Sequence, residues 1–249
     1  MIRSLFRKRA ATSPPRVPDD VRLYAIGDIH GCDALFRALL EKIEIDDAAR
    51  PPKRTIFVLL GDFVDRGPDS AGVVERAIAL SIAGNVRSLA GNHEEVFLLA
   101  CEGNPAALRM FARIGGRETA LSYGMSTEQY ESADYEELAR WLGAHVPAAH
   151  VQFLRSLENV IQIGDYVFVH AGIRPGVALA DQKISDLRWI RGDFLRHGDA
   201  HEKFVIHGHT ITTEVDSQCN RLGIDTGAYE SGRLTAVGME GDQRWFLST

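Results

Sequence analysis

The chain has few cysteines, no excess of positive charge and no long apolar run. Its 249 residues include only three cysteines, and none of them forms a C-x-x-C pair. A sparse, odd-numbered set does not make a disulfide framework, so we expect a reducing, cytoplasmic compartment. The net charge of −6 argues against nucleic-acid binding, for which a basic face is expected. No apolar stretch approaches the roughly 20 residues of a membrane span, so we expect no stable membrane association.

The first 20 residues differ in composition from the rest of the chain. They carry several arginines and a lysine, followed by a Ser-Pro-Pro run, and they lack the apolar core of a secretory signal. This composition predicts a disordered basic tail over residues 1–20. We interpret residues 21–249 as a single domain, since a chain of this length fits one large domain.

Short apolar runs alternate with polar loops and helical patterns along the chain. This alternation is typical of an α/β fold, in which ligands bind beyond the carboxyl ends of the strands. Residues 94–157 are mostly helical in pattern and predict an insertion beside the site. The runs that predict strands are residues 21–26, 55–60, 86–89, 166–169, 204–206, 222–224, 234–238 and 244–247.

Five polar motifs follow the apolar runs. In chain order they are G-D-I-H-G, G-D-F-V-D-R-G, G-N-H-E, H-A-G and G-H-T. Any one of their residues alone would be better read as a turn residue or a buried histidine. Together they offer carboxylate, amide and imidazole ligands, which suit two divalent metals about 3.5–4 Å apart. The candidate ligands are Asp28, His30, Asp62, Asn92, His170 and His209.

The motif set resembles that of the PPP-type serine/threonine protein phosphatases, most closely their compact bacterial and phage members. The resemblance implies the calcineurin-like metallophosphoesterase fold, an αββα sandwich, with a helical insertion in this chain. It implies that Asp28, His30 and Asp62 hold one metal, and that Asp62, Asn92, His170 and His209 hold the other. It favours Mn²⁺, although the ligand types also suit Fe and Zn. Ile211 stands where other metallophosphoesterases have a further histidine, which favours the phosphatase branch.

Further residues of these motifs are candidates for catalysis. His93 could protonate the leaving alkoxide, and Asp65 could orient its imidazole ring. Arg66 could hold two phosphate oxygens. A W-I-R segment resembles the W-x-R of the phage-like members and points to Arg191 as a second phosphate-binding arginine, with Arg174 as its competitor. We expect direct attack by a metal-bridging hydroxide, with no covalent phosphoenzyme.

Three functions follow from these residues. The first is hydrolysis of phosphoserine or phosphothreonine, with phosphotyrosine as an additional candidate, in a phosphoprotein or phosphopeptide partner. The second is a symmetrical diadenosine tetraphosphate hydrolase, whose motifs also include H-A-G-I. Ile173 matches that motif, so this second function remains an alternative. Glu94, Asp65 and Thr210 favour the first over the second. The third is a metal-bound scaffold without activity, which the complete ligand set disfavours.

Overall fold

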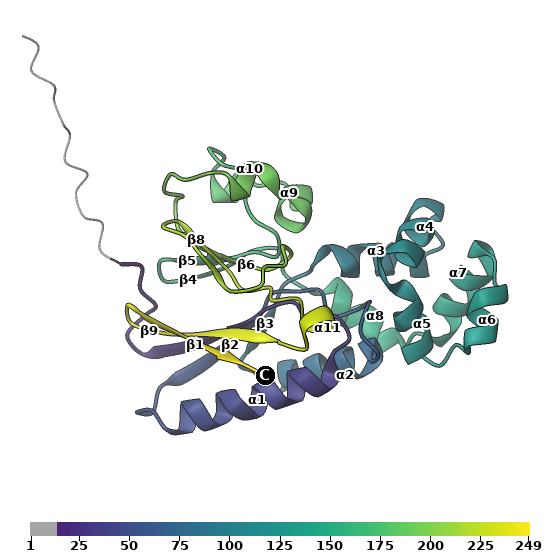
Figure 1. Cartoon of the computed structure of the whole chain (residues 1–249), viewed down its shortest axis with the longest axis horizontal. Coiled ribbons are helices and arrows are strands. Elements are labelled where there is room, and N and C mark those ends of the chain that lie inside the picture. Colours follow the sequence, from purple (N-terminus) through teal and green to yellow (C-terminus); the bar gives the residue numbers. More distant parts are fainter. Residues whose placement is uncertain (1–13) are drawn as a thin grey trace, which may run out of the picture.

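The computed structural model describes residues 14–249 of the chain. In these residues, two five-stranded sheets lie face to face with helices on their outer sides (Figure 1). This arrangement confirms the α/β sandwich expected from the sequence. No helix of the described part is both long and apolar enough to cross a membrane.

The first sheet has the strand order β10-β9-β1-β2-β3. Strands β1, β2 and β3 run parallel, while β9 and β10 are antiparallel to their neighbours. Because parallel neighbours need a crossover, α1 and α2 connect β1 to β2 and β2 to β3. The bounds are β1 Val21–Ile26, α1 Asp33–Ala48, β2 Arg54–Leu59, α2 Ser70–Ile82, β3 Val86–Ser88, β9 Thr235–Glu240 and β10 Gln243–Ser248.

The second sheet has the order β4-β5-β6-β8-β7, with β5, β6 and β8 parallel. Two short helices, α9 and α10, lie over its outer face (Figure 1), and a 3₁₀ turn, Leu179–Asp181, precedes them. The bounds are β4 Ile161–Ile163, β5 Tyr166–Phe168, α9 Ile184–Trp189, α10 Gly192–Leu195, β6 Phe204–His207, β7 Asp216–Ser217, β8 Arg221–Gly223 and α11 Ala228–Ser231.

The period-two alternation of the strands divides the core into layers. In β1, Tyr24 and Ile26 belong to the cluster that includes helix α1, whereas Leu23 and Ala25 belong to the cluster between the sheets. On the outer face of the second sheet, residues of β5 and β6 pack with Leu187 and Phe194. The central strands β1, β5 and β6 are therefore buried on both faces, which explains why they are mainly apolar rather than alternating.

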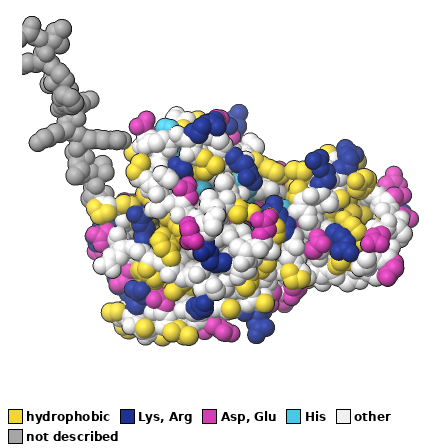
Figure 2. Space-filling view, in the orientation of Figure 1, with side chains coloured by type: hydrophobic (Ala, Val, Ile, Leu, Met, Phe, Trp, Pro, Cys, Tyr) yellow, Lys and Arg dark blue, Asp and Glu magenta, His cyan; other side chains and the backbone are white. Residues whose placement is uncertain are grey.

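Six helices fill the segment between β3 and β4 and project as a lobe from the sandwich (Figures 1 and 2). Local sequence signals define their ends. Asn104 caps α4, which has Pro105 in its first turn, and Ser126 and Asp134 form capping boxes at α6 and α7. The bounds are α3 Asn92–Cys101, α4 Pro105–Ile114, α5 Gly116–Ser122, α6 Thr127–Ser132, α7 Tyr135–His145 and α8 Ala148–Arg155.

Some boundaries differ from those expected. Residues 1–13 of the predicted tail lie outside the described residues. Residues 14–20 run along the sandwich, where Val17 is buried and its amide donates to the carbonyl of Gly241. Strand β2 is buried only toward its carboxyl end, since Arg54 is exposed. Strands β4 and β7 have no clear sequence signal because each is very short.

Candidate metal centre

The polar motifs meet at the carboxyl ends of five parallel strands. Asp28 follows β1, Asp62 follows β2, Asn92 opens α3 after β3, His170 follows β5 and His209 follows β6. All five side chains are buried. Two groups of side chains could hold a metal ion, and Asp62 belongs to both of them: Asp62 with His30 and His93, and Asp62 with His170 and His209. The two sheets thus bring together residues that are far apart in sequence.

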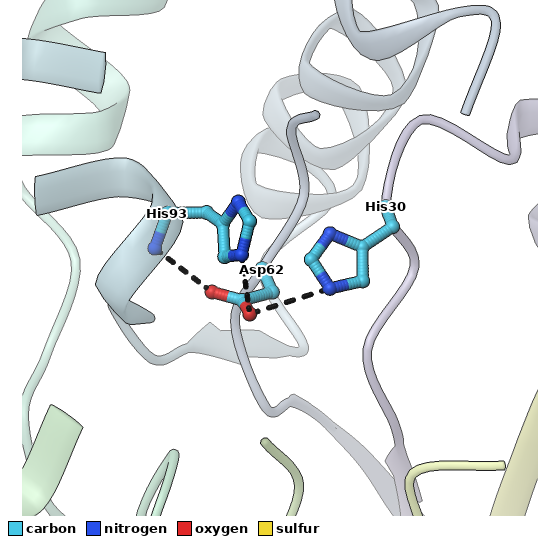
Figure 3. Close-up of side chains that lie close together, drawn as sticks. All are labelled: His30, Asp62 and His93. Atoms are coloured by element: carbon cyan, nitrogen blue, oxygen red, sulfur yellow. Dashed lines mark hydrogen bonds and ion pairs between the residues drawn. The ribbon is translucent and has the colours of Figure 1, made fainter. Parts of the chain in front are cut away.

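Asp62 lies at the middle of the centre. Its Oδ2 atom is 3.4 Å from Nε2 of His30 and 3.9 Å from Nε2 of His93, while Oδ1 accepts from the backbone amide of His93 at 3.1 Å (Figure 3). Oδ1 is also 3.4 Å from Nε2 of His170. The two carboxylate oxygens therefore face opposite groups of ligands, as a carboxylate shared by two cations does.

Backbone carbonyls orient two of the histidines. Nδ1 of His30 lies 2.9 Å from the carbonyl oxygen of Val64, and Nδ1 of His170 lies 2.8 Å from that of Leu60. A carbonyl only accepts, so Nδ1 carries the proton in both rings and the Nε2 lone pair points into the centre. Nε2 of His170 also lies 3.0 Å from Oδ1 of Asn92.

The protonation states of the centre suit a cation. Burial lowers the pKa of His30 to about 3 and that of His209 to about 2, and it also lowers the pKa of His170. Burial would raise the pKa of Asp62, but the surrounding histidines outweigh it and hold that pKa below its usual range. Neutral imidazoles beside an ionised carboxylate are the forms that bind metals.

Asp28 provides the test of whether a cation fits. Its Oδ2 accepts from the amide of His209 at 2.9 Å, but its Oδ1 is buried without a hydrogen-bond partner. Burial, together with the charges of Asp225 and Asp62, raises the pKa of Asp28. An unpartnered buried carboxylate oxygen is costly, and a coordinated cation removes that cost. The carboxylate and imidazole groups around Asp62, together with the unpartnered Oδ1 of Asp28, therefore fit a divalent metal.

Backbone strain is concentrated at the centre. In the described part of the chain, the non-glycine residues with positive φ are His30, Asp62, Asp65, Arg66 and His209. Every one belongs to a motif of the site. Such conformations cost about 1–3 kcal/mol each and persist where the surrounding contacts enforce them. The centre is therefore held in place by its surroundings rather than by local backbone preference.

His93 and Asp65 form a buried pair beside the ligands. Nδ1 of His93 lies 2.7 Å from Oδ2 of Asp65, and the His93 side chain is 2% exposed. Burial works to lower the pKa of His93, but the charges of Asp62 and Asp65 outweigh it and raise that pKa. The pair can therefore hold a proton on His93, which is what the expected role requires.

Arg66 lies at the opening of the centre. Its Nη1 donates to the hydroxyl of Tyr229 at 2.9 Å, and its Nη2 lies 3.2 Å from Nε2 of His93. The ring of Tyr229 packs edge-on against His30 with centroids 5.4 Å apart. The hydrogen bond to Arg66 places Tyr229 at the site.

The two competing arginines lie in different surroundings. Nε of Arg191 donates to Nε2 of His209 at 3.1 Å. Arg174 instead pairs with Asp186 of α9 at 2.6 Å and with Asp193 of α10 at 2.5 Å. Arg191 is thus in direct contact with a candidate ligand, whereas two carboxylates hold Arg174 elsewhere.

Sequence reasoning missed the structural role of Glu94. Its carboxylate accepts from the amides of Asp62, Phe63 and Gly91 at 2.8, 2.7 and 2.8 Å. Burial raises the pKa of Glu94 to about 7. Since it joins the loops after β2 and β3, Glu94 fixes the position of Asp62 relative to α3. The G-N-H-E motif contains this residue, but a motif does not reveal which backbone groups it contacts.

The chain matches the family model of calcineurin-like phosphoesterases over residues 21–231. The chain belongs to that family. Membership implies divalent metal ions, and the two groups centred on Asp62 are able to hold them. The family also accounts for the αββα sandwich.

Several curated proteins are similar to this chain. An asymmetrical bis(5'-nucleosyl)-tetraphosphatase of Anoxybacillus flavithermus is 29% identical, over 85% of this chain and 88% of the relative. A symmetrical bis(5'-nucleosyl)-tetraphosphatase of Acidovorax sp. is 36% identical, over 61% of this chain and only 44% of the relative. The chain therefore spans nearly all of the first relative and less than half of the second.

Solved structures agree on the fold. The crystal structure of a candidate diadenosine tetraphosphatase has a TM-score of 0.64 at 21% identity and covers 95% of this chain and 98% of its own. A cold-active protein-tyrosine phosphatase of Shewanella has a TM-score of 0.55 at 18% identity, covering 93% of this chain and 83% of its own. At these identities the likeness concerns the fold alone.

The relatives correct the prediction of substrate. Hydrolysis of phosphoserine or phosphothreonine in a phosphoprotein was the first expectation, and it is wrong. The relatives that align over most of both chains are named tetraphosphatases of bis(5'-nucleosyl) substrates. Glu94, Asp65 and Thr210 favoured the phosphoprotein substrate over the dinucleotide, and that preference was wrong.

Proposed function

We propose that this protein hydrolyses bis(5'-nucleosyl) tetraphosphates such as diadenosine tetraphosphate. The observation that carries the proposal is the extent of the similarity to the asymmetrical tetraphosphatase of Anoxybacillus flavithermus, which includes 85% of this chain and 88% of that protein. The buried centre of carboxylates and imidazoles supports a metal-dependent phosphoester or phosphoanhydride hydrolase.

The residues that would hold the metals include the histidines around Asp62 other than His93, together with Asp28 and Asn92. We propose Asp28, His30 and Asp62 for one ion, and Asp62, Asn92, His170 and His209 for the other. Mn²⁺ is our first choice, because these ligand types suit it and the family resemblance favours it. When bound, such ions supply Lewis-acid stabilisation of the phosphoryl group and acidify water.

The chain's own residues would bind and orient the phosphate chain. Arg66 and Arg191 stand on either side of the candidate ligands, in contact with His93 and His209. Their guanidinium groups can bind phosphate oxygens and neutralise charge that develops on them. His93, supported by Asp65, can donate a proton to the departing oxygen. That oxygen belongs to a nucleotide phosphate rather than to the alkoxide first expected, so it needs less protonation.

The cleavage position follows from the same similarity. Asymmetrical hydrolysis adds water across an outer phosphoanhydride and gives ATP and AMP, whereas symmetrical hydrolysis gives two ADP. We expect ATP and AMP, because the asymmetrical relatives align over 87–88% of their own length and the symmetrical ones over 44–54%. The three cysteines are free, which agrees with the cytoplasmic location that we propose.

The first test is hydrolysis of diadenosine tetraphosphate by protein stripped of metal and then supplied with Mn²⁺, with a phosphothreonine peptide assayed in parallel. We expect metal-dependent release of ATP and AMP, resolved by ion-exchange chromatography, with little peptide turnover. Release of two ADP would support the proposed hydrolase activity but would show that cleavage is symmetrical rather than asymmetrical. Peptide turnover without nucleotide cleavage would overturn the proposal.

A matched pair of variants tests the phosphate-binding arginines. Arg191→Ala is expected to lower kcat/KM by about 10- to 100-fold, because it removes a charged donor beside His209. Arg174→Ala is expected to change kcat/KM by less than about threefold, since Asp186 and Asp193 hold that side chain. Steady-state kinetics with diadenosine tetraphosphate measure both. A larger loss in Arg174→Ala would reverse the assignment.

A further inference from the structure

Helix α5 of the insertion contacts Asp65 through a buried hydroxyl. Thr119 lies in α5, is fully buried, and its Oγ1 is 2.7 Å from Oδ1 of Asp65. The other carboxylate oxygen of Asp65 faces Nδ1 of His93, also at 2.7 Å. Asp65 is therefore held from two sides, by the insertion and by the imidazole of α3.

The proton count fixes the direction of these hydrogen bonds. An ionised carboxylate only accepts, so both Thr119 and His93 must donate to Asp65. Thr119 has one hydroxyl proton, and Ser70 lies 2.9 Å from its Oγ1, so Ser70 must donate to Thr119. The amide of Asp65 donates back to both hydroxyl oxygens, at 2.8 and 3.0 Å. The network has one consistent arrangement, in which Nδ1 of His93 carries a proton.

The same contacts support a strained part of the backbone. Asp65 and Arg66 are consecutive non-glycine residues with φ of 72° each. The amide of Asp65 is held by Thr119 and Ser70, and that of Arg66 donates to the carbonyl of Gly115 at 3.1 Å. Nε of Arg66 also donates to the carbonyl of Ile114. The corner between α4 and α5 thus contacts both residues of the D-R pair.

We propose that Thr119 is a positioning residue, whose hydroxyl fixes the Asp65 carboxylate and through it the tautomer and orientation of His93. The inference rests on the proposed function for its substrate. The helical insertion is therefore part of the reactive centre and not only a cover beside it.

The test compares Thr119→Val, which keeps the shape and loses the hydroxyl, with Thr119→Ser, which keeps the hydroxyl. We expect Thr119→Val to lower kcat by about 10- to 100-fold with KM changed less than about threefold. Thr119→Ser should remain within about threefold of the wild type. The control is Ser122→Ala in the same helix, which removes hydrogen bonds with the amide of Ala71 in α2 and with the backbone carbonyl of Thr119 but does not touch Asp65. It should retain full kcat.

A double-mutant cycle separates positioning from a general loss of structure. In a His93→Asn background, Thr119→Val should lower kcat by less than about twofold further, because the residue it positions is already gone. An equal loss in both backgrounds would overturn the proposal, and so would a Thr119→Ser variant as impaired as Thr119→Val. If Thr119→Val does not fold, Ser70→Ala replaces it in the cycle, since it removes the donor to Thr119.

A spectroscopic measurement tests the role of Thr119 independently of which substrate the protein hydrolyses. Nitrogen NMR of histidine-labelled protein should show His93 protonated at Nδ1 in the wild type and a mixture of tautomers in Thr119→Val. An unchanged spectrum would overturn the positioning role. p-Nitrophenyl phosphate serves for the kinetics if diadenosine tetraphosphate is not cleaved, so failure of the proposed function and failure of this inference are distinguishable.

Discussion

Asp62→Asn is expected to abolish hydrolysis of diadenosine tetraphosphate, with a loss in kcat/KM of at least about a thousandfold, the scale observed when a central member of a catalytic unit is removed. The two oxygens of Asp62 face both groups of candidate ligands, and His30 and His170 each lie 3.4 Å from one of them. Asparagine keeps the shape of the side chain, but it removes the charge and points an NH₂ group at a cation.

Metal content measured after gel filtration checks the cause of that loss. We expect Asp62→Asn to retain less Mn²⁺ than the wild type after both have been loaded equally. Asp193→Asn is the matched control, because its side chain is 58% exposed and pairs only with surface arginines. It should keep both activity and metal. An Asp62→Asn protein with full metal content and full turnover would refute the shared-ligand assignment.

Gly91→Ala is expected to disable the same carboxylate without altering any polar group. A Cβ atom at this position would lie 2.0 Å from Oδ1 of Asp62 and 2.7 Å from the Asp62 amide nitrogen. The backbone of Gly91 has φ −87° and ψ −179°, which alanine adopts freely. The clash therefore displaces Asp62 itself. A displacement of about 1 Å can cost about a hundredfold in rate, so we expect a loss of that size in kcat/KM.

Titration of Mn²⁺ by calorimetry measures the accompanying change in affinity, which should fall at least about tenfold. Gly198→Ala is the control, since an added Cβ there meets nothing within 4 Å and its φ is not positive. Wild-type affinity and turnover in Gly91→Ala would show that Asp62 does not depend on this close approach.

The sequence was sufficient to predict the sandwich and the cluster of motif residues. Parallel strands end at a common edge, so polar residues that follow Ile26 and Leu59 must lie near each other once the strands pair. The helix caps at Asn104 and Asp134 were not predicted, although they depend only on neighbours within a few residues. These features arise from local chemistry combined with one simple rule of topology.

The substrate was predicted wrongly from three residues that do not report on it. Glu94 contacts backbone amides of the loops after β2 and β3, and Asp65 contacts His93 and Thr119. The hydroxyl of Thr210 is buried without a partner in the described structure. Glu94 and Asp65 maintain the centre, so they are compatible with more than one phosphate-containing substrate. The extent of similarity to whole relatives was the better guide.

By itself, the sequence determined the fold class and the set of side chains gathered at the sheet edge, because strand pairing and residue type are sufficient for both. Only the tertiary structure showed that Arg191 contacts a candidate ligand whereas Arg174 pairs with carboxylates, and connected Thr119 to Asp65. Each of those contacts joins segments whose separation in space depends on how the insertion and the second sheet pack, and no local pattern encodes that packing.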